Sequence, residues 1–432
     1  MARKMKDSGI EWIGEIPEEW SKNKVIRLFD IIGSGTTPKN ITSDFPVVNW
    51  IQSGDITGSF MPTCKNVISA NLLSQYSALK VYPAPFIIIA MYGASVGNAS
   101  ISLIDGCVNQ ACCVLSSPSC NLHYAFYVIK SAQSYLVRKA VGGGQPNISQ
   151  ETIKQLWLPL PPLSTQDIIV RNLDATCSKI DDLLSSVHAS IEEYKKLKQA
   201  VITLAVTKGV RGEREMKDSG VEWIGEIPAE WSITKIKSGV TKIGSGKTPS
   251  GGAETYTDSG VIFLRSQNIY DCTLNLESPT YISPEVDATM KSTRVLPDDV
   301  LLNITGGSIG RCSIVPKTLG LANVNQHVCI IRTNPLIFLP KYMQYFWVST
   351  LGHLAIDLYQ TGGNREGMSA DAIRNTPIPY APLNEQKEIA DYLDAKCAEI
   401  DKLIAKKEQL VKELESYKKS LIYEVVTGKR EV

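Results

Sequence analysis

Two long stretches of the chain repeat apolar residues at alternating steps of four and three positions. After the proline-rich segment that precedes each stretch, no glycine or proline occurs until Gly209 and Gly428. A heptad pattern of this kind predicts a long coiled-coil helix, and about 33 residues at ~1.5 Å per residue span on the order of 50 Å. The repeating positions are Leu173, Cys177, Ile180, Leu184, Val187, Ile191 and Tyr194 in the first stretch, and Leu393, Cys397, Ile400, Ile404, Val411, Leu414, Leu421 and Val425 in the second.

The part of the chain before each heptad stretch follows a different pattern. It is rich in glycine, serine, proline, threonine and β-branched residues, and its apolar runs are short. Short runs between turn residues predict β-strands, and more helical segments follow them. We therefore expect a mixed α/β globular domain before each helix. The strand candidates include 46–51, 86–91, 261–264 and 328–331, and the helical segments are 122–140 and 340–358.

The two halves of the chain are copies of one unit. Residues 5–20 and 216–231 are identical at fourteen of sixteen positions, and later landmarks such as Asn109-Gln110 and Asn325-Gln326 keep their order. Self-similarity of this kind indicates a tandem duplication. We expect an α/β (α+β) domain at 1–157, a helical spacer at 158–215, a second domain at 216–377 and a second spacer at 378–432. We also expect the two helices to pack as an antiparallel coiled coil, with a pseudo-twofold relation between the copies.

Composition and charge narrow the class of protein. Hydrophobic residues make up 43% of the chain and charged residues 21%, which excludes global disorder. The longest apolar stretch, around Phe86–Met91, is far shorter than the ~20 residues of a membrane span. With no signal peptide recognisable, we expect a cytoplasmic protein without membrane association, whose ten cysteines are reduced. The net charge of +1 does not by itself indicate nucleic-acid binding.

No catalytic or metal-binding pattern is recognisable in the sequence. The segment 241–248 approaches a P-loop, but Thr241 stands at the place of the first glycine, and the matching segment Gly33–Pro38 has no lysine. The four histidines are scattered and no Cys-x-x-Cys pair occurs, so we expect no zinc site. The Asn/Asp-Pro-Pro-aromatic tetrad of amino-methyltransferases is also missing. We therefore expect a protein without catalysis of its own.

Polar residues in loops, at matching places in both copies, are the candidates for a binding function. Arginine, glutamine and asparagine can read guanine and adenine edges bidentately, and glycine-rich loops let the backbone approach phosphate. Each residue taken alone is more often part of an ordinary solvated turn. Matching places with different side chains are what reading two different half-sites would require. The candidates are Gln52, Ser53, Asp55, Gln145 and Asn147 in the first copy, and Lys247, Arg265, Gln267, Asn268, Asn364 and Arg365 in the second.

Four motifs recur in the same order in both copies. They are the opening Trp12–Trp20 with its copy Trp223–Trp231, the Gly33–Pro38 loop, the stretch Pro159–Gln166 with its copy Pro379–Gln386, and the Leu-Asp…Ile-Asp helix openings at 173–181 and 393–401. Together they resemble the specificity subunit of a type I restriction–modification enzyme over essentially the whole chain. The resemblance implies two target recognition domains, each reading one half of a bipartite, asymmetric DNA site, with the helical pair setting the spacing.

The resemblance also implies partners that carry the chemistry. The chain would bind double-stranded DNA and dock two modification (methyltransferase) subunits, which methylate adenine N6 from S-adenosylmethionine, and restriction (translocase/endonuclease) subunits, which use ATP and Mg²⁺. No cofactor is expected on this chain. The near-neutral charge favours phosphate contacts supplied by the modification subunits, and hence weak DNA binding by the isolated chain.

Two other classes of protein remain open at this point. A coiled-coil scaffold protein without DNA sequence readout would explain the helices but would leave the duplicated polar loops without a purpose. A P-loop enzyme would need the altered motif at 241–248 to bind ATP.

Overall fold

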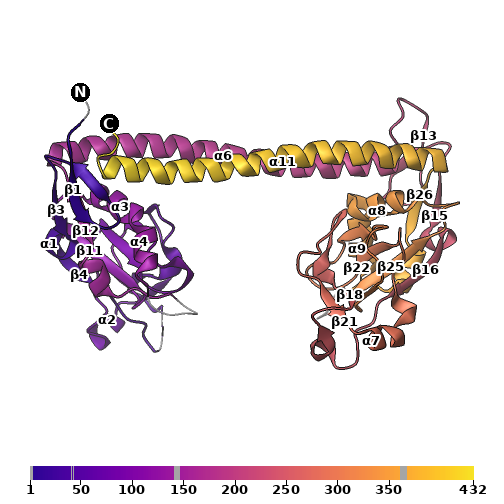
Figure 1. Ribbon diagram of the computed structural model, residues 1–432, viewed down its shortest axis with the longest axis horizontal. Helices are drawn as coiled ribbons and strands as arrows, with labels where there is room; N and C mark the ends of the chain where they lie inside the picture. The colour runs from indigo at the N-terminus through magenta and orange to yellow at the C-terminus, as the bar shows by residue number, and fades with distance from the viewer. Residues whose placement is uncertain (1–2, 40, 42, 141–145, 361–366) are drawn as a thin grey trace. The chain divides into compact units, whose positions relative to one another are not determined.

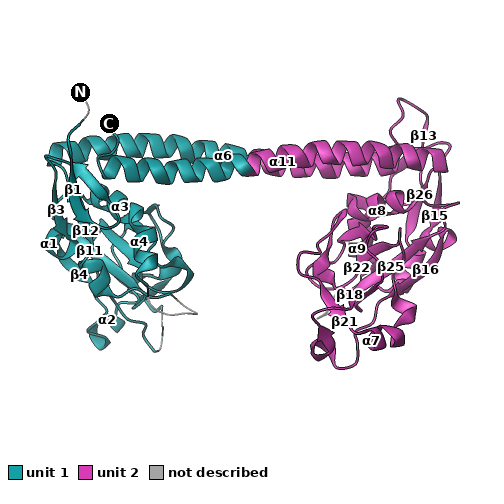
Figure 2. Ribbon diagram, viewed as in Figure 1, with its two compact units in different colours: residues 1–187, 409–432 teal, residues 188–408 magenta. Residues whose placement is uncertain are grey.

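The computed structural model describes residues 3–39, 41, 43–140, 146–360 and 367–432. The chain forms two compact units (Figure 1). Unit 1 comprises residues 1–187 and 409–432, and unit 2 comprises residues 188–408 (Figure 2). Each unit thus contains one α/β domain together with a part of both long helices. None of the helices in the described ranges is both long enough and apolar enough to cross a bilayer.

Unit 1 is built on a five-stranded sheet in the order β4-β11-β8-β9-β6 and a three-stranded sheet in the order β10-β5-β7. Its elements are β1 (Met5–Ile10), β2 (Gly14–Pro17), β3 (Ser21–Lys24), α1 (Val25–Leu28), β4 (Phe29–Gly33), β5 (Val47–Ile51), η1 (Ser53–Asp55), β6 (Phe60–Met61), β7 (Val67–Ser69), α2 (Leu72–Gln75), β8 (Phe86–Ala90), η2 (Gly93–Ser95), β9 (Ala99–Ser102), β10 (Cys107–Val108), β11 (Cys112–Pro118), α3 (Leu122–Ser131), α4 (Gln133–Arg138), α5 (Gln150–Lys154), β12 (Trp157–Leu160) and the first part of α6 (Leu163–Lys208).

Unit 2 is built on two four-stranded sheets, in the orders β16-β25-β22-β23 and β17-β21-β18-β24. Its elements are β13 (Met216–Asp218), β14 (Glu226–Pro228), β15 (Ser232–Lys235), η3 (Ile236–Gly239), β16 (Val240–Ser245), η4 (Gly252–Thr255), β17 (Tyr256–Thr257), β18 (Val261–Leu264), η5 (Ser266–Asn268), β19 (Ile269–Tyr270), β20 (Thr273–Leu274), β21 (Thr280–Ile282), α7 (Pro284–Thr289), η6 (Lys291–Thr293), β22 (Val300–Asn303), β23 (Cys312–Ile314), β24 (Ala322–Val324), β25 (Val328–Thr333), α8 (Pro340–Val348), α9 (Thr350–Tyr359), α10 (Ala370–Asn375), β26 (Pro377–Tyr380) and the first part of α11 (Leu383–Val426).

The two domains repeat one strand arrangement. In unit 1, β11 pairs antiparallel with β4 and β8, and β10 pairs parallel with β5. In unit 2, β25 pairs antiparallel with β16 and β22, and β24 pairs parallel with β18. The predicted pair of mixed α/β domains, each followed by a long helix, is therefore confirmed.

The long helices begin and end where the sequence places its helix breakers. α6 starts directly after Pro161-Pro162, and it ends before Gly209, whose φ is +74°. Gly428, two residues beyond the end of α11, also has φ +74°. Glycine adopts this left-handed conformation without steric cost, so it commonly terminates helices.

The long helices pair antiparallel, as predicted. In unit 2, Lys198 Nζ lies 2.7 Å from Asp401 Oδ1. One turn earlier on α6, Tyr194 faces Lys407, which lies later on α11, at 5.6 Å between Nζ and the ring centroid. In unit 1, Lys418 Nζ lies 2.7 Å from Asp181 Oδ2. Sequence positions that rise along one helix therefore meet positions that fall along the other.

Each domain shares one hydrophobic core with the helix ends beside it. In unit 1, Leu173 from α6 and Ile422 from α11 join the cluster that contains Ile87 and Ile89 of β8. In unit 2, Ile202 from α6 and Leu393 from α11 join the cluster that contains Leu302 of β22. All seven of these side chains are at most 3% exposed. A helix end cannot separate from its domain without exposing this apolar surface to water.

Two buried tyrosines add polar contacts to this junction in unit 1. The Tyr124 hydroxyl lies 2.9 Å from the Pro159 carbonyl oxygen and 3.1 Å from that of Val426, at the end of α11. The Tyr127 hydroxyl donates to Asp174 Oδ1 on α6 at 2.6 Å. Burial, and secondarily the Asp174 carboxylate, raises the pKa of Tyr127, so its hydroxyl stays a proton donor.

The same contacts recur in unit 2. The Tyr342 hydroxyl lies 2.9 Å from the Pro379 carbonyl oxygen and 3.3 Å from that of Val206 on α6. The Tyr345 hydroxyl donates to Asp394 Oδ1 on α11 at 2.6 Å. The duplication has therefore kept the junction between domain and helices.

A glycine allows two backbone segments to meet at the edge of each domain. A β-carbon on Gly35 would lie 1.7 Å from the Val108 carbonyl oxygen, and one on Gly246 would lie 2.1 Å from that of Val324. In unit 2 the Gly246 N–H donates to Val328 O at 2.9 Å, and the Lys247 N–H donates to Val324 O at 3.1 Å. These amides are already bonded to carbonyl groups, so this loop is not arranged to hold a phosphate as a P-loop does.

Loss of the Tyr345 hydroxyl should weaken the junction in unit 2. Tyr345→Phe leaves the Asp394 carboxylate without this donor, and we expect the free energy of unfolding to fall by about 1–2 kcal/mol. Denaturation by urea, followed by tryptophan fluorescence, measures the change. Tyr359→Phe, at an exposed tyrosine of the same unit, should change it by less than about 0.5 kcal/mol. Equal effects of the two changes would contradict the role given to Tyr345.

A methyl group at Gly246 should be poorly tolerated. Gly246→Ala places its β-carbon against two backbone carbonyls, which cannot move like flexible side chains. We expect a loss of stability of about 1–3 kcal/mol or failure to fold. Gly244→Ala is the matched control, because nothing lies within 4 Å of a β-carbon there. A thermal melt in which the two variants agree would show that the close approach is not required.

Candidate nucleic-acid interface

A short turn follows the buried end of a strand in both units and carries several of the predicted binding residues. In unit 1 the turn η1 follows β5, and the Gln52 N–H donates to Asp55 Oδ2 at 2.9 Å. In unit 2 the turn η5 follows β18, and the Arg265 N–H donates to Asn268 Oδ1 at 2.9 Å. The two turns therefore share one geometry, which the side chain at their last position holds.

These bonds divide the predicted residues into two groups. Asn268 is 5% exposed and also donates through Nδ2 to the Asn275 carbonyl oxygen at 3.0 Å, so its side chain serves the turn itself. Asp55 closes the matching turn. Ser53 is half-buried, and Gln267 is exposed. The half-buried Gln52 and Arg265 directly precede η1 and η5, and each is the first residue of the longer turn that Asp55 or Asn268 closes.

Arg265 is partly prepared for a ligand by its surroundings. Its guanidinium carbon lies 5.5 Å from the ring centroid of Tyr256. Within the part of the chain that the structure describes, its Nε is buried and has no hydrogen-bond acceptor. Stacking on an aromatic ring orients the planar guanidinium while its edge nitrogens can still donate.

Each unit has a second turn, which starts at Gly93 in unit 1 and at Gly306 in unit 2. The strand end before this turn pairs with the segment that follows the glycine-rich loop. In unit 1 the Ile148 N–H donates to Met91 O at 2.9 Å, which places Asn147 opposite Tyr92. In unit 2 the Met368 N–H donates to Ile304 O at 2.9 Å, which places Gly367 opposite Thr305. Asn147 is exposed. The predicted residues Gln145, Asn364 and Arg365 lie outside the described residues.

Backbone hydrogen bonds join the loops of some predicted residues to one segment in each unit. In unit 2 the loop of the exposed Lys247 and the turn of Arg265 meet at one segment: Lys247 N–H donates to Val324 O, and the Asn325 N–H donates to Leu264 O at 3.0 Å. In unit 1 the Asn109 N–H donates to Ile51 O at 3.1 Å, directly before Gln52. The neighbouring Gln110 receives a hydrogen bond from Thr37 Oγ1 at 2.6 Å.

Side chains that the sequence did not single out also lie on these loops. The Arg311 guanidinium carbon is 4.6 Å from the ring centroid of the exposed Tyr270, directly after η5. Thr305 Oγ1 lies 2.6 Å from His327 Nδ1. Asn325-Gln326 was already visible as a landmark of the duplication, and the adjacent His327 could have been found from it.

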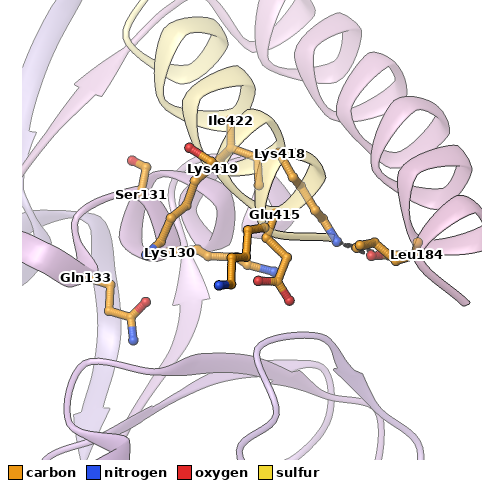
Figure 3. A pocket seen from close by; sticks show the side chains of 11 residues that line it. Lys130, Ser131, Gln133, Leu184, Glu415, Lys418, Lys419 and Ile422 are labelled. Atoms are coloured by element: carbon orange, nitrogen blue, oxygen red, sulfur yellow. Dashed lines mark hydrogen bonds and ion pairs between the residues drawn. The ribbon is translucent and has the colours of Figure 1, made fainter. Parts of the chain in front are cut away.

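A groove of about 570 Å³ in unit 1 lies between α3, α4 and the helical pair (Figure 3). Lys130, Lys412, Lys418 and Lys419 line it together with Glu415. Burial, and then the charge of Lys418, lowers the pKa of Lys130. The Lys130 ammonium group already donates to the Gly58 carbonyl oxygen, and Lys418 pairs with Asp181. Two of the four cations are thus engaged within the protein.

Most of the cysteines in the described residues are core thiols. All ten are free, and eight of them are buried. Burial raises the pKa of Cys107 to about 11 and that of Cys329 to about 12, so these two thiols are protonated at neutral pH and are poor nucleophiles. Among the described residues, no group of three or more His, Cys, Asp or Glu side chains is arranged to hold a metal ion.

Comparisons with known proteins agree with the duplicated architecture. The family described as Type I restriction modification DNA specificity domain matches residues 17–193 and 228–413. The type I restriction enzyme MjaVIII specificity subunit of Methanocaldococcus jannaschii is 27% identical over 319 residues, which cover 71% of this chain and 69% of the relative. The type I restriction enzyme EcoBI specificity subunit of Escherichia coli is 24% identical over 366 residues, which cover 81% of this chain and 75% of the relative.

The fold is also similar to a solved structure. A chain studied for complex assembly and conformational transition of the type I R-M system aligns with a TM-score of 0.74 at 16% identity, covering 96% of this chain and 99% of that chain. At this identity the likeness concerns the fold. The family match covers most of the chain and falls once in each half. The chain therefore belongs to the type I restriction modification DNA specificity family, and it carries the specificity domain twice.

Proposed function

We propose that this chain is the DNA-recognition subunit of a type I restriction–modification complex, in which each unit reads one half of a bipartite, asymmetric site. One observation carries the proposal: the two units hold turns of the same geometry but present different side chains on them. Gln52 stands where unit 2 has Arg265, and Gly54 stands where unit 2 has Gln267. The same turn with different side chains in the two units suits recognition of two half-sites that differ in sequence.

The chemistry of these side chains suits the edges of base pairs. Arginine pairs bidentately with guanine O6 and N7, and glutamine pairs with adenine N6 and N7. Arg265 and Gln52 are therefore the leading candidates for base contact, while Lys247 is exposed and suits a phosphate. Asp55 and Asn268 position the turns from within.

The helical pair sets the spacing of the half-sites and docks two modification subunits. Its outer surface carries apolar side chains spaced at multiples of seven residues: Leu183 in unit 1, Leu197 and Leu204 in unit 2 on α6, and Leu410 and Tyr417 in unit 1 on α11. Each of them is more than 40% exposed. Helices of a partner could bury such rows by coiled-coil packing.

The chemistry of the complex then belongs to the partner subunits. The relatives are named specificity subunits, which supports a chain that selects the site without catalysis of its own. S-adenosylmethionine is assigned to the modification subunits, and ATP and Mg²⁺ to the restriction subunits. The near-neutral charge of this chain suits a complex in which the modification subunits contribute most phosphate contacts. A coiled-coil scaffold without DNA readout would leave the matched turns unexplained.

Methylation mapping tests the proposed function. The chain is co-expressed with its modification subunit, and N6-methyladenine is mapped on plasmid DNA by long-read sequencing. We expect one bipartite motif with a fixed gap, because two reading units are held by one pair of helices. A single contiguous motif would show that one unit does not read DNA, and a soluble complex without methylation would favour the scaffold function.

Removal of the Arg265 guanidinium should affect one half-site alone. Because a misread base pair costs ~1–3 kcal/mol, Arg265→Ala should reduce discrimination at one position of the half-site read by unit 2 by about tenfold. Methylation rates on DNA with single base changes measure this ratio. Lys317→Ala is the control. It removes an exposed positive charge that follows the C-terminal end of β23, whereas Arg311 precedes its N-terminal end, and it should leave the ratio unchanged. Wild-type discrimination in Arg265→Ala would remove this residue from the interface.

A further inference from the structure

Asn303 is a buried amide that joins two loops of unit 2. It ends β22 and is fully buried. Its Nδ2 donates to the Ser266 carbonyl oxygen at 2.9 Å and lies 3.1 Å from Ser308 Oγ. Ser266 belongs to the turn η5 that follows Arg265, and Ser308 belongs to the next turn along the chain from β22. One side chain thus spans the two turns at the candidate interface.

The orientation of the Asn303 amide follows from its neighbours. A carbonyl oxygen can only accept, so the group that faces Ser266 O must be the NH₂ and not the amide oxygen. The Asn303 Oδ1 is then left buried without a partner among the described residues. An unpartnered buried acceptor costs free energy, so an apolar residue would suit this strand position better on stability alone.

The other copy of the domain contains that apolar residue. Asn303 pairs with Val328 in the sheet of unit 2, and Ala90 pairs with Cys112 at the same place in the sheet of unit 1. Both strands lead, three residues later, into a matching turn that starts at Gly93 or Gly306. Ala90 is fully buried, so the fold accepts alanine at this position.

In unit 1 the turn that contains Gln52 is stabilised by a different contact. There Asn66 Nδ2 donates to Gln52 Oε1 at 3.1 Å, so the support reaches the side chain at the first position of the turn. In unit 2 the support comes from the sheet and reaches the turn backbone directly after Arg265. The backbone carbonyl of Ser266 also accepts from the Ile269 N–H. This carbonyl therefore receives one hydrogen bond from the residue that follows η5 and one from Asn303 of the sheet.

We propose that Asn303 is a positioning residue for sequence discrimination by unit 2. It fixes the Arg265–Asn268 turn relative to the turn 305–308, and thereby fixes the guanidinium of Arg265 relative to the base it reads. This inference rests on the proposed function, since it concerns how accurately the half-site of unit 2 is selected. Its physical basis is that bidentate recognition tolerates little displacement of the donor group.

The test measures discrimination in the assembled complex. Asn303→Ala is co-expressed with the modification subunit, and methylation rates are measured on the cognate site and on sites with one base changed in either half. The half-site of unit 2 is the one that changes when residues 216–377 are exchanged for another recognition domain. We expect Asn303→Ala to lower discrimination in that half by about tenfold and to leave the other half unchanged.

Two further variants separate positioning from stability. Ser308→Ala removes one acceptor of the Asn303 amide and should lower discrimination in the same half by a smaller factor, about threefold. Gln344→Leu, at a buried amide of α8 that makes no side-chain hydrogen bond to either turn in the described residues, can alter the melting temperature but should leave discrimination unchanged.

The outcomes are distinct from those of the proposed function. If the wild-type complex methylates a bipartite motif but Asn303→Ala discriminates as well as wild type, the inference is overturned and the proposed function stands. Equal loss in both halves would also overturn it, because a positioning role is confined to unit 2. If Asn303→Ala yields no soluble complex, Ser308→Ala decides: unchanged discrimination there overturns the inference. Absence of a bipartite motif in the wild type would instead refute the proposed function.

Discussion

The shared core between each domain and the helix ends beside it is the constraint on which the rest of the structure depends. A long antiparallel helix pair alone would give its domains no fixed attachment. Here Ile422 of α11 and Leu173 of α6 lie in the same apolar cluster as the central strand of the unit 1 sheet. Tyr127 adds a hydrogen bond to Asp174 within that junction. Helix and domain must therefore fold as one body within each unit.

This constraint explains which parts of the duplicated domain have stayed alike. The tyrosine contacts at the junction and the strand pairings recur in both copies. So does the glycine that lets two backbone segments approach closely, Gly35 beside Val108 in unit 1 and Gly246 beside Val324 in unit 2. Each of them is fixed by packing, where a change of one group costs free energy directly. The first residues of the two turns, Gln52 and Arg265, are only half-buried, so packing restricts them less. Gln52 and Arg265 could diverge because the turn is closed by Asp55 or Asn268 instead.

The two copies also differ at a fully buried position. Unit 2 places the buried amide of Asn303 where unit 1 places the methyl group of Ala90. A change at a fully buried position can move a loop without touching any ligand, since a strand end and the turn beside it are coupled by short contacts. Specificity in such a domain would then be distributed between the residues that meet DNA and those that hold the loops.

The sequence alone determined the duplication, the two α/β domains, the two long helices and the family. These features are encoded by local or repeated signals: heptads between Pro162 and Gly209, short apolar runs, and motifs repeated in order. The candidate site was only partly accessible in this way. The sequence did not show that the loop of Lys247 and the turn of Arg265 contact the same segment 324–325, and it did not encode the direction of individual side chains.

Only the tertiary structure decided that Asn268 turns inward, that Arg265 stacks on Tyr256, and that Asn303 joins two turns. The reason is physical. Helix periodicity depends on neighbours three and four residues away, whereas a polar side chain in an irregular turn faces whichever distant segment the fold brings to it.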